Sequence, residues 1–121
     1  MTELSVAEVL ERAADLIEPE GAWTQGAFAR NAQGKDTGLS ESRGPATCWC
    51  VLGATDHVSG EDDPVVQADH LLAQVIGGAA HNGLGEWNDA PGRTQSEVVA
   101  KLREAAALAR QSALQKGASH A

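Results

Sequence analysis

The stretch "GPATCWCVLGATDHV", residues 44–58, decides how the rest of the chain is arranged. It offers two starting points for a helix, Pro45 and Thr47, because proline suits the first helical turn and threonine suits an N-cap. Gly53 lies inside the stretch and allows another backbone to come close. We therefore expect a helix that starts near Pro45 to Thr47, runs to about Val58 and is buried on most sides.

The same stretch holds the only two cysteines of the chain, Cys48 and Cys50, on either side of Trp49. Two residues apart, they are poorly placed to form a disulfide with each other, and in a helix they point to different sides. Free cysteine is among the most buried residue types. We therefore interpret both as core residues.

A thiol enzyme remains an alternative at these cysteines. A thiol at the start of a helix has a lowered pKa and can act as a nucleophile. Cys50 or Cys48 would then need His57 or His81 as a base. A zinc site would need four Cys or His ligands with paired local spacing, and only one such pair is present. We therefore predict no metal and no cofactor.

Capping signals mark the other helices. Ser5 and Glu8 form a capping box that begins a first helix. A third helix is expected over about residues 64–77. Thr94 and Glu97 form a second capping box, which begins the last helix. Together with the helix in the opening stretch, these signals predict a mostly α fold with about four helices.

The segments between the helices are less regular. We expect a short β-hairpin or extended segment near residues 23–37, because small residues alternate there with aromatic and polar ones. Residues 34–45 should form a loop, and residues 77–85 a flexible end to the third helix. The length of 121 residues suits one domain, residues 1–121.

The ends of this domain are expected to differ from its middle. The ordered core should extend over about residues 5–115. The tail, residues 116–121, should fray, because terminal residues without packing partners are poorly ordered.

Composition limits the classes of partner. The net charge is −8, with only nine Lys and Arg residues, and phosphate binding requires basic patches. A nucleic acid is therefore an improbable partner, whereas a protein partner or a homodimer is plausible. No run of 18 apolar residues and no signal peptide is present, so we expect no membrane association and a cytoplasmic protein with reduced thiols.

Two further stretches could form a binding pocket. In "WNDAPGRT", residues 87–94, an aromatic ring is followed by polar side chains, and "WTQ" near residue 23 repeats that combination. One interpretation is a rigid turn in which Arg93 pairs with Asp89. The other is a pocket rim with two opposite walls. The candidate binding residues are Trp23, Thr24, Gln25, Trp87, Asn88, Asp89 and Arg93.

These stretches resemble three signature motifs of a family of short bacterial and phage proteins of unknown function. The motifs are W-T-Q-G at 23–26, W-C-x-x-G-A at 49–54 and W-N-D-x-x-x-R-T at 87–94. Cys50 matches the cysteine of the family, while Cys48 is an additional one. The resemblance implies a common fold and no particular activity.

The sequence therefore predicts a small non-enzymatic accessory or binding protein. The thiol-dependent hydrolase is one alternative. Another is an acidic inhibitor or nucleic-acid mimic from a phage-related context, which would require carboxylates gathered on one face.

Overall fold

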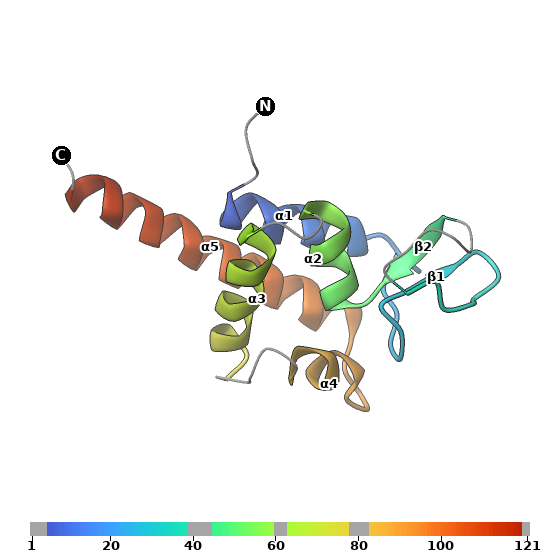
Figure 1. The fold of residues 1–121 in the computed structure, drawn as a ribbon. Coiled ribbons are helices and arrows are strands. Elements are labelled where there is room, and N and C mark those ends of the chain that lie inside the picture. The colour runs from blue at the N-terminus through green and yellow to red at the C-terminus, as the bar shows by residue number, and fades with distance from the viewer. Residues whose placement is uncertain (1–4, 39–44, 60–62, 78–82, 120–121) are drawn as a thin grey trace.

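The computed structural model describes residues 5–38, 45–59, 63–77 and 83–119 (Figure 1). These residues form five helices and two short strands, so the protein is a mostly α domain. In chain order the elements are α1 (Val6–Ile17), β1 (Ala29–Asn31), β2 (Ala46–Trp49), α2 (Val51–Ser59), α3 (Asp63–Val75), α4 (Gly83–Asp89) and α5 (Gln95–Ser119).

The core lies between α1, α2, α3 and α5: α1 and α3 pack against α5, and α2 packs against α1 and α3. Helices α1 and α5 pack against each other and run antiparallel. Their orientation is seen at the Gln95 side chain at the start of α5, which donates to the Ile17 carbonyl at the end of α1. Figure 1 shows the C-terminal part of α5 extending beyond the other helices, on the side away from the strands. The largest fully buried apolar side chains are Leu10, Ile17, Leu72, Leu84, Leu102, Val9, Val51 and Val98.

Ion pairs fix the register of α1 against α5. Arg103 of α5 contacts Glu11 and Asp15 of α1, and Glu18 at its C-cap, at N–O distances of 3.1, 3.0 and 3.2 Å. Arg110 lies two turns further along α5 and contacts Glu11 at 3.0 Å. An acidic stripe on α1 therefore faces a basic stripe on α5.

Both predicted capping boxes are confirmed. The Ser5 hydroxyl accepts from the Glu8 amide at 3.1 Å, and the Glu8 carboxylate accepts from the Ser5 amide at 3.0 Å. At α5 the Glu97 amide donates to the Thr94 hydroxyl, and the Glu97 carboxylate accepts from the Thr94 amide. These bonds satisfy amides that have no partner within the helix.

The predicted start of the second helix, at Pro45 or Thr47, is wrong, whereas its predicted end near Val58 agrees with the end of α2 at Ser59. Residues 46–49 form strand β2, which pairs antiparallel with β1, and α2 begins only at Val51. The main-chain groups of Trp49 bond to another extended segment instead: its amide donates to Ala22 O and its carbonyl accepts from the Thr24 amide. Tertiary pairing thus overrides the local helix signals.

This change also corrects the placement of the cysteines. Cys48 lies on β2, opposite Arg30 of β1, and is half-buried. Cys50 is buried and precedes α2, where its carbonyl accepts from the Ala54 amide as an N-cap carbonyl does. The two thiols therefore belong to different elements rather than to different faces of one helix.

The extended segment near residues 23–37 is present, but its pairing is broader than a local hairpin. Strand β1 turns back at residues 31–35, so that Arg30 and Asp36 form an antiparallel bridge. Its main partner is β2, which comes from the stretch for which the sequence predicts a helix. Of the predicted loop over 34–45, residues 39–44 lie outside the described residues.

Helix α4 was not predicted. The predicted flexible segment includes residues 83–85, which instead form the first turn of α4 and place Leu84 fully in the core. Two glycines, Gly83 and Gly85, reduce the helix propensity of this stretch, and packing against α2 and α3 supplies the missing stability. Residues 78–82 of the predicted flexible segment, including His81, lie outside the described residues.

Gly53 has the role that the sequence indicated. A Cβ atom built at this position would overlap the carbonyl oxygen of Phe28, which accepts from the Cys50 amide at 3.0 Å. Only glycine therefore allows the chain before β1 to rest on the first turn of α2.

Candidate functional site

The three motif stretches meet at the side chain of Asn88, which is fully buried at the end of α4. Its Oδ1 accepts from the Trp23 indole Nε1 at 2.8 Å and from the Val51 amide at 3.0 Å. Its Nδ2 donates to Thr24 O at 3.1 Å and to Asp89 Oδ1 at 3.0 Å. An asparagine amide has two donor hydrogens and two lone pairs, so all four are used. We call this meeting point, formed by residues 23–26, 50–51 and 88–90, the Asn88 junction.

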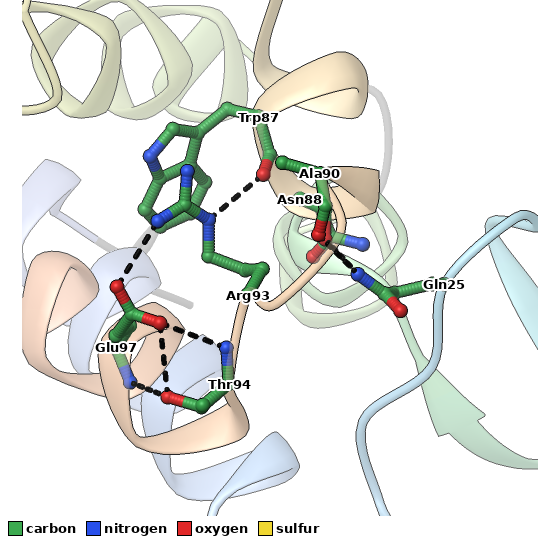
Figure 2. A network of polar contacts seen from close by, with 7 residues as sticks. All are labelled: Gln25, Trp87, Asn88, Ala90, Arg93, Thr94 and Glu97. Carbon is green, nitrogen blue, oxygen red and sulfur yellow. Dashed lines mark hydrogen bonds and ion pairs between the residues drawn. The ribbon is translucent and has the colours of Figure 1, made fainter.

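Two neighbours of Asn88 complete the contact between the first and third motifs. The Gln25 side-chain Nε2 donates to Asn88 O at 2.9 Å and to Ala90 O at 3.1 Å (Figure 2). The Gly26 amide donates to Asp89 Oδ1 at 2.9 Å. The two predicted pocket walls are thus joined directly by hydrogen bonds.

Arg93 does not form the predicted pair with Asp89. Its guanidinium lies over the Trp87 ring, with Cζ 4.2 Å from the ring centroid, and its Nε donates to Trp87 O at 2.9 Å (Figure 2). Its Nη1 forms an ion pair with Glu97 at 3.1 Å. The turn at 90–92 directs Arg93 back over α4, while the Asp89 carboxylate is held by Gly26.

Arg30 is a member of the site that sequence reasoning missed. Its guanidinium donates to Thr24 Oγ1 at 3.1 Å, Gln25 O at 3.2 Å and Gly34 O at 3.1 Å. These bonds from Arg30 therefore stabilise the conformation of the W-T-Q-G segment. Its place at the end of the same motif stretch, "GAWTQGAFAR", was the available signal.

Cys50 adds its thiol to the cap of α2. The Gly53 amide donates to Cys50 Sγ at 3.4 Å, and Asn88 takes the Val51 amide, so the start of this helix is capped from within the fold. Burial is the main cause that raises the pKa of the Cys50 thiol above its ordinary value. A buried, protonated thiol is the opposite of an activated nucleophile.

The remaining catalytic candidates do not gather around Cys50. His57 is exposed and lies two turns along α2, roughly 10 Å of helix rise from Cys50. Its ring stands 5.0 Å from that of Trp49, tilted by 47°. The half-buried Cys48 Sγ lies 4.0 Å from Arg30 O, and His81 is outside the described residues.

The polar groups of the described residues are well satisfied. Among them, no buried side-chain nitrogen or oxygen lacks a hydrogen-bond partner. In the same residues, no group of three or more His, Cys, Asp or Glu side chains is placed to hold a metal ion. No described helix has the length and apolar character needed to cross a membrane.

The fold and the Asn88 junction together define a class: a small, mostly helical domain in which three tryptophan-containing segments are tied by mutual hydrogen bonds. A family model described as a family of unknown function, DUF6197, matches residues 1–108. The chain belongs to this family, which confirms the expectation of a family of unknown function. No curated protein and no solved structure gives a significant match.

Proposed function

We propose that the protein is a non-enzymatic binding protein that acts through a protein partner. The observation that carries this proposal is the Asn88 junction. Its polar side chains bond to one another and to the main chain, so none of these bonding groups is left poised for a substrate. The motifs then serve to hold a rigid surface, which is how a binding module presents its contacts.

The state of Cys50 supports this proposal over the thiol-dependent hydrolase. A nucleophilic cysteine needs a lowered pKa and a base within about 3 Å. Burial instead raises the pKa of the Cys50 thiol, whose sulfur already accepts a bond from Gly53.

The pairing of the α1 carboxylates argues against the alternative of an acidic nucleic-acid mimic. A mimic of nucleic acid would present unpaired negative charges in rows. Glu11, Asp15 and Glu18 instead share the guanidinium of Arg103, and Glu11 also contacts Arg110. Pairing with arginine removes much of the negative potential that such a row would need.

The first experiment measures the reactivity of Cys50. We expect iodoacetamide at pH 7.5 to modify Cys50 at least tenfold more slowly in the folded protein than in urea, because the thiol is buried and protonated. Half-buried Cys48 is the internal control. Faster alkylation of Cys50 in the folded state would support the hydrolase instead.

The second experiment asks whether the protein works in a complex. The labelled full chain is sedimented in lysate of its host and compared with the Cys50→Ser variant, in which serine keeps the N-cap bond but removes the thiol. We expect both to sediment in the same complex, larger than one chain. Sedimentation only as a monomer at all concentrations would overturn the binding function.

A further inference from the structure

We infer that the partner is a protein with a basic surface. It docks at the end of this molecule that the motif segments form, where Phe28 is the apolar side chain that inserts into the partner. This inference rests on the proposed binding function and names the partner of the same site. It combines the position of the aromatic residues with the distribution of charge.

The aromatic residues are gathered in the motif segments. The chain has three Trp, one Phe and no Tyr, and all four lie within or directly beside the three motifs. Phe28 is 43% exposed, while the tryptophans are half-buried. The segment that contains Phe28, residues 23–31 with β1, lies on the side of the molecule away from the free end of α5 (Figure 1). Aromatic side chains are enriched at the centres of protein interfaces.

Of the basic side chains described at this end, Arg30 and Arg93 are used inside the fold, while Lys35 in the turn after β1 is exposed. Arg30 donates to three oxygens of its own hairpin, and Arg93 is held by Trp87 and Glu97. Exposed carboxylates remain in the same segments. Glu20 and Glu86 form no ion pair with any described residue, and Asp89 is exposed beside Gly26. Exposed carboxylates outnumber Lys35 among the described side chains of these segments, so the docking end carries a net negative charge.

This charge selects among the possible occupants. Nucleic acids and anionic lipid surfaces are repelled by a chain of net charge −8. A second copy of the chain carries the same charge and is repelled as well. A protein with Lys and Arg around an apolar recess is attracted and matches both features of this end.

The test places a photo-crosslinking phenylalanine analogue at position 28 of the full chain in host cells. The same analogue at Leu108, the other large exposed apolar residue of the described part, is the matched control. Mass spectrometry identifies the adducts. We expect one dominant adduct from position 28 that is absent from position 108, and the adduct should be a protein with a basic surface.

Binding is then measured with the purified partner. Phe28→Ala should weaken the Kd at least tenfold, and Leu108→Ala should change it less than twofold. Raising the salt from 50 to 500 mM should slow association at least tenfold, because attraction between opposite charges is screened.

Other outcomes separate the two proposals. A second copy of the chain as the adduct, or a salt-independent association, would overturn the basic partner while leaving the binding function intact. The same adducts from positions 28 and 108 would overturn the location. The binding function itself fails only if the chain sediments as a monomer.

Discussion

At the scale of single residues, the side chain of Asn88 connects the three motif stretches. One amide ties the indole of Trp23, the first amide of α2 and the carbonyl of Thr24 to α4. A polar group at full burial stabilises a fold only when it is completely bonded. Asn88 meets this condition, so its removal should cost more than its size suggests.

Asn88→Ala should destabilise the protein by about 2–4 kcal/mol. The substitution leaves the Val51 amide and the Trp23 indole as buried donors without an acceptor, and each such loss costs roughly 1–3 kcal/mol. Urea unfolding followed by circular dichroism measures the change. Asp89→Asn, which keeps an acceptor oxygen for Gly26, is the control and should cost less than about 1 kcal/mol. Equal effects of the two variants would contradict the central role of Asn88.

Gly53→Ala should be more harmful than its size suggests, because the new methyl group would overlap the Phe28 carbonyl. We expect a loss of roughly 3 kcal/mol or more, as for other overpacked and strained positions. Gly85→Ala is a matched helical control: its methyl group would lie 3.8 Å from Leu52 Cδ1, in ordinary contact. That variant should be neutral or stabilised by up to about 1 kcal/mol. Thermal unfolding compares the two, and a similar Tm for both would refute the close approach.

The sequence allowed Gly53 to be recognised as a contact point but could not reveal its partner. Likewise the pairing of the Trp23 and Trp87 segments was expected, while Asn88 as the hub was not. A side chain with four bonding groups shows its role only when the groups that it meets are known. Those groups include main-chain amides, such as that of Val51, which any residue carries.

At the scale of elements, local signals predicted the helices that carry their own caps. Helices α1 and α5 begin where their capping boxes lie, because these bonds form within four residues. The predictions fail where contacts between residues that are distant in the sequence determine the secondary structure. Strand β2 and helix α4 depend on β1, α2 and α3, and no short window of sequence contains those contacts.

The ion pairs that Arg103 and Arg110 of α5 form with α1, which we call the ion-pair ladder, are a second feature at this scale. Arg103→Met keeps most of the apolar stem but removes the charge that three carboxylates share. Because Arg103 is about one-third exposed, we expect a modest loss of about 1 kcal/mol at low salt, which shrinks in 1 M NaCl. Lys101→Met breaks only a pair within α5 and should have less than half this effect. Urea titrations at both salt concentrations test the ladder, and a salt-independent loss would argue against it.

At the scale of the whole molecule, stability should depend on pH at both ends of the range. Main-chain hydrogen bonds to Ser5 and Thr94 hold the pKa values of Glu8 and Glu97 below their ordinary value of 4.5. A lowered folded-state pKa contributes stability above 4.5, and this contribution is lost as the pH falls through the lowered values. Burial raises the pKa of Cys50 above 9.0, so stability also falls as the pH rises beyond 9.0.

Urea midpoints measured from pH 3 to pH 10.5 should therefore form a plateau between about 5 and 9. The double variant Glu8→Gln and Glu97→Gln should flatten the acid limb, since glutamine does not titrate. Cys50→Ser should flatten the alkaline limb in the same way. An alkaline limb unchanged in the serine variant would show that Cys50 is not its cause.

The antiparallel pairing of α1 with α5 has a consequence for how the protein is made. Glu11 of α1 bonds to Arg103 of α5, 92 positions away, and to Arg110 of α5, 99 positions away. During synthesis, α1 leaves the ribosome long before α5 exists, so its apolar face has no permanent cover. The nascent chain can close its core only after residues 95–110 have emerged. Folding is thus a single late event rather than a gradual one. A ribosome stalled before α5 should display a chain that proteases cut readily.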